Sequence, residues 1–481
     1  MLRTLIEKEL KAILLSPKFT AVFAVCSILI ILSIYIGIEE YKASMAHYET
    51  VNAQLNQGMK DETRWMNLTT GVNRYPDPML IFISGIHNDI GRTAPISQAG
   101  TIKLYNSNYS ENTIFAVFRF MDLMFIVQIV LSLFAILFTY DAINGERETG
   151  TLKLSFANPI PRTSYIIAKL IGSWFGLVIP MLIPLLLGIA IVLLYKIPMT
   201  GTHWLRLAIL IGLSVLYFTF FICLGILLSS LTRSSTGSFL YLLVIWVALV
   251  LIIPRAGVMI AGQFKPVPTA AEISSKLSQK AREMYDQLTE WAKERQKGLT
   301  ARYQGLQDLS PQERQAKIKE ILEEYLGEMR EEQEKISRKI AKYDASLNED
   351  WRNRKAEREK LGFSISRFSP ASAYQLAAME LAGTGMSLKT SYEDQLRSYS
   401  DIFNKFRAKK AAEAGTNAFM LIGQENKQEP LDLSEVPKFK YVNTDITKIF
   451  QITMIDFGII SIYILIIMAG TFIAFIRYDV R

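Results

Sequence analysis

Six apolar runs, each close to the roughly 20 residues that an α-helix needs to cross a bilayer, constrain this chain more than any other feature. They lie at 18–38, 119–140, 164–195, 204–229, 236–254 and 452–476. Charged residues still make up 20% of the 481 residues, so they are concentrated between these runs. The pattern predicts an all-α polytopic membrane protein with six transmembrane helices. The third run is too long for one perpendicular helix, and Pro180 and Pro184 predict a kinked or broken span there.

Lysine and arginine in the short connecting segments predict the orientation of the spans. The ends of the chain and the segments 141–163 and 230–235 carry most of these residues, whereas the opposite short loop, 196–203, carries only Lys196. Both termini are therefore predicted to be cytoplasmic. Residues 1–17 then form an amphipathic interfacial helix, and 477–481 form a short cytoplasmic tail. The first apolar run lacks a small-residue cleavage site, so we interpret it as a retained anchor.

Two large segments, 39–118 and 255–451, are predicted to lie outside the membrane. The first begins as a helix that continues from its span and then turns into an irregular or partly β platform, because Gly, Pro and Asn accumulate. In the second, two long charged helices over 270–360 predict an antiparallel hairpin. Ser310 is the expected N-cap of its second helix and Pro311 the first helical residue. We interpret the charges as a solvated face rather than a binding patch, and a dimeric coiled coil remains an alternative.

The sequence lacks the motifs of the common enzyme classes. It contains no phosphate-binding G-x-x-x-x-G-K-[ST], no G-x-S-x-G and no H-E-x-x-H. Cys26 and Cys223 both fall in predicted spans, and the three histidines are scattered, so neither a disulfide framework nor a zinc site is predicted. The positive-inside bias explains much of the net charge of +8, so nucleic-acid binding is not indicated. We expect no enzyme activity, cofactor or metal in this chain.

The most structured charged segment is NGERETGTLKLSFANPIPR, residues 144–162, between the second and third runs. Glu146 and Glu148 lie near the start of a predicted short helix, where the helix dipole favours anions. Gly145 and Gly150 permit tight turns, and Pro159 stops the run. Such a segment is suited to bind a partner with fixed geometry, although a charged loop that only anchors its two spans is the alternative.

This segment resembles the cytoplasmic coupling loop of ABC transporter permeases. The resemblance is closest to the type V exporter fold, in particular to the permeases of nitrous-oxide reductase maturation and of bacterial gliding. The N-terminal LRTLIEKELKAILLSPKF is similar to the interfacial helix of that family, and LTRSSTGS (231–238) stands where a second, shorter coupling element is found. SPASAYQLAAMELAGT (369–384) resembles a motif of family members that carry a large outer domain before the last span. That large insertion departs from the compact exporters of this fold, so their substrates are not carried over.

The resemblance implies a permease subunit, most simply of an exporter. A separate nucleotide-binding ATPase subunit would bind ATP and Mg, and a second permease chain, identical or paralogous, would complete the transporter. It also implies a multi-pass protein of a bacterial inner or plasma membrane, with an extracytoplasmic partner protein as a further expectation. The alternative is a non-transporting mechanotransmission or adaptor protein that acts on such a partner.

The residues expected to couple to the ATPase are Asp141, Gly145, Glu146, Arg147, Glu148, Gly150, Thr151 and Leu152. Thr232, Arg233 and Ser234 are expected to form a second cytoplasmic contact, and the outer motif is represented by Ser369, Pro370, Gly383 and Thr384.

Overall fold

The computed structural model describes residues 2–477 apart from 66, 89, 91–92, 97–120, 158, 305, 307–309 and 414–430. Parts of both predicted outer segments, the first two residues of the second predicted span (119–120) and most of the tail (478–481) therefore lie outside the described residues. The described chain forms two compact units, Met1–Ala256 with Ser366–Arg481, and Gly257–Ile365.

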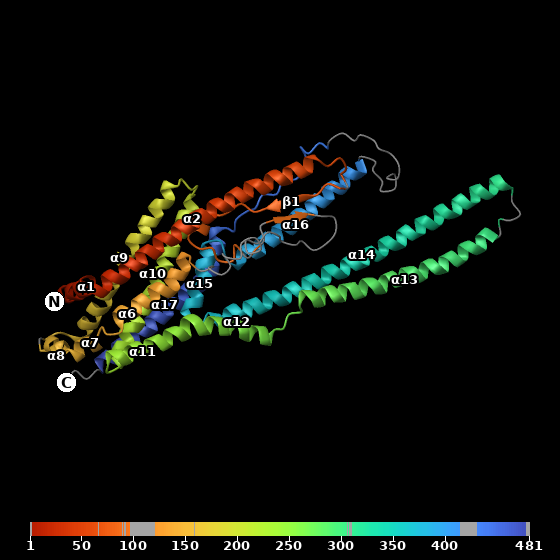
Figure 1. The fold of residues 1–481 in the computed structure, drawn as a ribbon. Coiled ribbons are helices and arrows are strands. Elements are labelled where there is room, and N and C mark those ends of the chain that lie inside the picture. Colours follow the sequence, from red (N-terminus) through yellow and green to blue (C-terminus); the bar gives the residue numbers. More distant parts are fainter. Residues whose placement is uncertain are drawn as a thin grey trace. The chain divides into compact units, whose positions relative to one another are not determined.

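Helices make up nearly all of the regular structure (Figure 1). The α-helices are α1 (Leu2–Leu14), α2 (Pro17–Lys60), α5 (Leu123–Phe125), α6 (Ser132–Thr139), α7 (Asn144–Glu148), α8 (Thr151–Phe156), α9 (Arg162–Leu194), α10 (Gly201–Leu231), α11 (Ser235–Trp246), α12 (Ile253–Phe264), α13 (Ala270–Gln304), α14 (Pro311–Ser366), α15 (Pro370–Leu381), α16 (Met386–Glu413) and α17 (Ile446–Ile476). The other elements are the 3-10 helix η1 (Pro78–Ile81), the π-helices η2 (Ile126–Leu131) and η3 (Val247–Ile252), and the strands β1 (Thr70–Asn73) and β2 (Thr93–Ile96).

Among the described residues, six helices are long and apolar enough to cross a membrane. They are Pro17–Lys60, Leu123–Glu148, Arg162–Leu194, Gly201–Leu231, Ser235–Phe264 and Ile446–Ile476. This confirms the predicted all-α polytopic class with six spans. The third span was predicted to be kinked or broken, and α9 runs as one helix through Pro180 and Pro184, so the prediction of a break was wrong. Each proline removes only one N–H donor, so the other backbone hydrogen bonds of this long apolar helix carry it past both residues.

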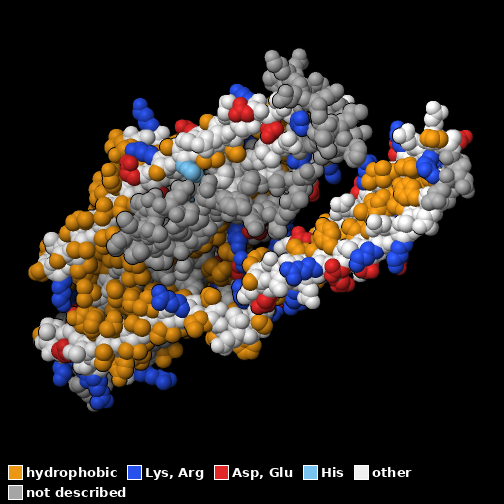
Figure 2. All heavy atoms as spheres, turned by 45° about the vertical axis from the view of Figure 1, so that its right-hand side comes forward, with side chains coloured by type: hydrophobic (Ala, Val, Ile, Leu, Met, Phe, Trp, Pro, Cys, Tyr) orange, Lys and Arg blue, Asp and Glu red, His pale blue; other side chains and the backbone are white. Residues whose placement is uncertain are grey.

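The outer faces of the spans are apolar, as expected for helices in contact with lipid. Leu186 of α9, Val244 of α11 and Ile466 of α17 are each about 60% exposed. Figure 2 shows hydrophobic side chains over the spans, and it shows Lys, Arg, Asp and Glu side chains interspersed with hydrophobic ones on the hairpin formed by α13 and α14.

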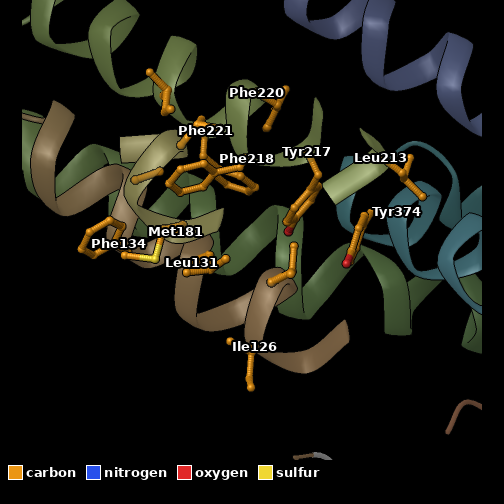
Figure 3. Packing of buried hydrophobic residues seen from close by; sticks show 14 of the residues in the cluster. Ile126, Leu131, Phe134, Met181, Leu213, Tyr217, Phe218, Phe220, Phe221 and Tyr374 are labelled. Atoms are coloured by element: carbon orange, nitrogen blue, oxygen red, sulfur yellow. The ribbon is translucent and has the colours of Figure 1, made fainter. Parts of the chain in front are cut away.

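The fourth span, α10, supplies much of the core of the first unit. Tyr217 and Phe221 are fully buried, and the Tyr217 ring stacks on Tyr374 of α15 with ring centroids 4.6 Å apart (Figure 3). The Tyr217 hydroxyl donates to the carbonyl of Gln128 in η2 at 3.0 Å, and the Ser132 hydroxyl donates to the same carbonyl at 2.6 Å. Because the π-helix departs from regular i→i+4 bonding, such side-chain donors satisfy carbonyls that an α-helix would pair internally.

A second apolar core lies in the same unit, away from the spans. Strands β1 and β2 pair antiparallel, with Thr70 opposite Ile96 and Asn73 opposite Thr93. Buried residues of this sheet and its flanking segments pack with the buried face of α16, which carries Leu388, Tyr392, Leu396 and Phe403. Helix α2 continues from the membrane to Lys60, and its Gly37 lies directly against the backbone of η1.

The second unit contains most of the helical hairpin α13–α14. Arg295 pairs with Glu328, and Arg302 with Glu324 at 2.9 Å, so residue numbers rise along one helix as they fall along the other. The two helices therefore run antiparallel. Near the other end, Ala261 of α12 lies against Gly362 of α14, where a Cβ on the glycine would be 3.4 Å from the alanine Cβ.

Candidate functional site

The segment between α6 and α9 folds into two short helices, α7 and α8, joined by a sharp turn. Gly150 forms this turn with φ 76°, a left-handed conformation that residues with a Cβ rarely adopt. Gly145 instead lies within α7, where its N–H donates to the Asp141 carbonyl at 2.8 Å. Leu152 of α8 is buried in the main core, with 1% of its surface exposed. The pair of helices is therefore seated on the bundle by an apolar anchor.

Glu146 of α7 is held in a network of charges that joins three helices. Its Oε1 accepts from Lys169 Nζ of α9 at 2.9 Å and from Lys8 Nζ of α1 at 3.0 Å. Its Oε2 accepts from the Tyr165 hydroxyl at 2.5 Å. Lys169 Nζ also lies 2.7 Å from Glu9 Oε1 of α1, and only 4% of the lysine side chain is exposed. A cation so far from water requires paired anions, and the two carboxylates supply them.

Two glycines allow α1 to approach α9 closely enough for this network. A Cβ on Gly172 would lie 2.5 Å from Glu9 Cβ, and one on Gly176 would lie 3.3 Å from Ile13 Cδ1. A larger residue at position 172 would push α1 away from α9. The small residues of α9 therefore help to bring Glu9 to Lys169.

The start of α7 is bonded to the end of α10 and to the turn between α10 and α11. The Ser229 hydroxyl accepts from the backbone N–H groups of Ile143 and Asn144, at 2.9 and 3.2 Å. Asn144 Nδ2 donates to Thr232 Oγ1 at 2.7 Å and to the Ser234 carbonyl at 3.3 Å.

Glu148 completes this attachment at the start of α11. Its carboxylate accepts from the Ser235 N–H at 2.8 Å and from the Ser235 hydroxyl at 2.9 Å. Ser234 is the N-cap of α11. An anion at this position also interacts favourably with the positive end of the helix dipole.

Helix α8 presents polar and apolar side chains outward. Thr151 and Lys153 are exposed, and Leu154 is 70% exposed. Arg233, in the neighbouring turn, is also exposed. This surface lies beside the internally bonded α7, so a partner bound to α8 would push on a rigidly held element.

The structure brings together the two residue sets that the sequence analysis predicted, separately, to be cytoplasmic. Thr232 and Ser234 contact α7, which carries Glu146, Arg147 and Glu148. The carboxylates of Glu146 and Glu148 bond to groups of this chain, so they hold the loop in place. Sequence reasoning missed the residues that bond to them or to their helix, namely Lys8, Tyr165, Lys169, Ser229 and Ser235, and it missed Glu9, which pairs with Lys169. An acid on the amphipathic first helix and a lysine within an apolar run were the available signals.

The outer motif lies elsewhere in the first unit. The fully buried Ser369 is the N-cap of α15, and its hydroxyl accepts from the N–H groups of Ala371 and Ser372 at 3.0 and 3.4 Å. Pro370 is the first residue of that helix. Gly383 follows the helix with φ 67°, and the Thr384 carbonyl accepts from the Ile86 N–H at 3.0 Å.

A small polar cavity lies beside this helix end. Its volume is about 20 Å³, room for one water molecule. Arg206 Nη2 donates to the Thr444 carbonyl at 3.1 Å, and Arg206 Nη1 lies 3.6 Å from Asp77 Oδ2. Burial raises the pKa of Glu380 at the cavity wall, although the Ser387 N–H opposes this effect by donating to the carboxylate.

An apolar cavity of about 50 Å³ lies among the first four spans. Its walls include Ile30, Leu131, Met181 and Phe218, of which the last three are seen in Figure 3. Ser214 contributes the one hydroxyl of the lining, and this group bonds to the Leu210 carbonyl and the Tyr374 hydroxyl. The cavity is suited to hydrocarbon rather than to a polar ligand.

Within the part of the chain that the structure describes, no group of three or more His, Cys, Asp or Glu side chains is placed to hold a metal ion.

A search among curated proteins found no match. A family model described as ABC-2 family transporter protein matches residues 3–480. The match and the six apolar helices agree on a multi-pass protein of the cell membrane, an ABC transporter permease subunit that pairs with an ABC ATPase subunit. The chain belongs to the ABC-2 family of transporter proteins.

Proposed function

We propose that this permease is the membrane subunit of an exporter, and that α7 and α8 are the elements through which its ATPase acts. The observation that carries the proposal is the attachment of α7 to α1, α9, α10 and α11 by internal bonds, while the adjacent α8 exposes Leu154. ATP and Mg would be bound by the ATPase subunit. This chain would supply the docking surface and the moving spans.

The bonds of α7 determine which spans would move if the ATPase displaced this helix. The Glu146–Lys169 ion pair leads into α9, the third span, and the Glu148–Ser235 bonds lead into α11, the fifth. Because these contacts involve backbone groups and a buried lysine, α7 cannot shift far without its neighbours. Displacement of the loop is therefore expected to tilt both spans.

The finer assignment follows the likeness of the loop, the first helix and the outer motif to the type V exporter fold. Two permease chains, identical or paralogous, would line a path between their first, second and fifth spans in a bacterial plasma membrane. The apolar cavity among the first four spans supports a substrate with a hydrocarbon part. The helical hairpin would engage an extracytoplasmic partner protein or gate the exit.

A second candidate function is mechanotransmission without transport, in which the complex acts on an outer partner. It is favoured by the hydrogen bonds that link the fifth span to the chain at the end of α14. ATP-dependent accumulation of a compound in inside-out vesicles would support export. Full ATPase coupling with no accumulation of any tested compound would support mechanotransmission.

Replacement of Leu154 by Asp is expected to weaken co-purification of the ATPase about thirtyfold, because loss of a central apolar anchor from an interface typically costs about 2 kcal/mol. Binding would be measured by titrating the purified permease with its ATPase. The side chain is exposed, so the variant should fold normally. Leu322→Asp on the hairpin, where the native side chain is 44% exposed, is the matched control and should bind like the wild type. Equal binding by both variants would place the ATPase contact away from α8.

A further inference from the structure

The outer motif at Ser369 and the coupling loop contact the same span. The fifth span is one continuous helix of 30 residues, Ser235–Phe264, formed by α11, η3 and α12. At its first residue, Ser235, it is bonded to Glu148 of α7. Further along, the carbonyls of Leu249 and Pro254 accept from the hydroxyls of Ser369 and Ser366. The distance along the helix from Ser235 to Pro254 is about 28 Å at 1.5 Å per residue, close to the roughly 30 Å of a bilayer core.

The Ser369 hydroxyl replaces a backbone hydrogen-bond donor that the fifth span lacks. In η3 the pairing is i→i+5, as shown by the bond from the Ile253 N–H to the Ala248 carbonyl. The next donor in this register would be residue 254, which is a proline without an N–H. The Leu249 carbonyl is therefore left without its helical donor, and the Ser369 hydroxyl supplies one. The same hydroxyl accepts from two N–H groups of α15, so its full bonding capacity is used.

The residues around Ser369 are also fixed to the sixth span. Arg367 forms a two-point ion pair with Asp456 of α17, with Nε 2.6 Å from Oδ1 and Nη2 3.3 Å from Oδ2. Asp456 has only 1% of its side chain exposed. The Tyr463 hydroxyl donates to the Phe368 carbonyl at 2.9 Å. We call residues 366–369 the root segment, because α14 returns the chain from the hairpin at Ser366.

We propose that the fifth span is a rigid link that carries displacement of α7 to the root segment, and through the root segment to the outer hairpin. The chain enters the hairpin through α12, which is the continuation of the fifth span itself, and leaves it at the end of α14. A shift of this span along its axis would move α12 directly, because α12 is part of the same helix. It would also move the end of α14, through the hydrogen bonds of Ser366 and Ser369 to the span. The inference rests on the proposed function, since it takes the ATPase as the source of the displacement.

The test uses the permease complex purified with its ATPase and reconstituted in nanodiscs. Both native cysteines, Cys26 and Cys223, are buried, so spin labels can be directed to exposed positions by Gln54→Cys on α2 and Gln279→Cys on α13. The distance distribution between the labels is measured without nucleotide and with ATP plus vanadate. The wild type is expected to change its distribution with nucleotide. S366A/S369G is expected to lose most of that change while keeping its ATPase activity, because glycine is a tolerated N-cap but lacks the hydroxyl.

The matched control is S364A/S372A, which removes two nearby hydroxyls that do not bond to the fifth span. It should retain the full nucleotide-dependent change. Should S366A/S369G not fold, S366A alone leaves the cap of α15 intact and is expected to lose part of the change. An unaltered response in the serine variants would overturn the proposal. If the label distance in the wild type did not change with nucleotide while the ATPase was bound at α8, the link proposed here would be refuted and the proposed function would stand. Absence of any ATPase from the complex would refute the proposed function itself.

Discussion

Replacement of Lys169 by Met is expected to lower the free energy of unfolding by about 3–5 kcal/mol, the usual cost of removing one partner from a buried ion pair. Lys169 is 2.7 Å from Glu9 and 2.9 Å from Glu146, whose side chains are 11% and 16% exposed. Lys8 would still contact Glu146, so Glu9 is the carboxylate left without a cation. The resulting change in the folding equilibrium is at least a hundredfold. It would be measured as the unfolding midpoint in mixed micelles of increasing SDS content.

Lys11→Met is the matched control for this prediction. Lys11 also pairs with a glutamate of α1, Glu7, but both side chains are more than half exposed. Exposed pairs contribute about 0–1 kcal/mol, so the control should unfold close to the wild type. K169M/E9Q/E146Q, which removes the charges of both acids together with the lysine, should recover part of the lost stability. Equal midpoints for K169M and K11M would show that the network does not fasten α7 to α1 and α9.

Replacement of Gly37 by Ala is expected to destabilise the first unit by about 3 kcal/mol. A Cβ at this position would lie 2.1 Å from the Ile81 carbonyl oxygen and 2.8 Å from its carbon. These are backbone atoms of η1, so they cannot rotate away as a side chain would, and overpacking of this kind usually costs about 1–3 kcal/mol or more. Gly37 thereby holds the first span close to η1 of the same unit. The same SDS titration would measure the effect.

Gly458→Ala in the sixth span provides the comparison. Nothing lies within 4 Å of a Cβ at that position. The substitution should therefore be neutral or stabilise by at most about 1 kcal/mol, since alanine favours a helix over glycine. If Gly37→Ala were as stable as Gly458→Ala, α2 and η1 would not be in close contact.

The six spans were predictable because membrane helices are defined by the length of their apolar runs. One short helix was predicted in the segment 144–162, where the structure has two, α7 and α8, and Gly150 and Pro159 were the signals for its turns. The two π-helices were not foreseen, because one wider turn leaves the apolar pattern of a span unchanged. Pro254 was a usable signal for the second of them, as it removes one helical donor.

The partners of the charged site residues were beyond the reach of sequence reasoning. Glu146 and Glu148 were expected to couple the loop to an ATPase, and the sequence contains nothing that says which groups their carboxylates meet. Lys169 is more than twenty residues from Glu146, and Ser235 is still further from Glu148. Such pairs depend on how α1, α9 and α11 pack around α7. The docking role of the loop stays a prediction, now centred on the exposed face of α8.

The most direct test of the central claim is photo-cross-linking from position 154 in the native membrane. A benzoylphenylalanine introduced in place of Leu154 would be activated, and the adducts identified by mass spectrometry, with the same group at position 322 of the hairpin as the comparison. The account predicts one dominant adduct from position 154, with an ABC ATPase subunit, and none with that subunit from position 322. An ATPase captured from position 322 and not from position 154 would contradict the assignment of α7 and α8 as the coupling element.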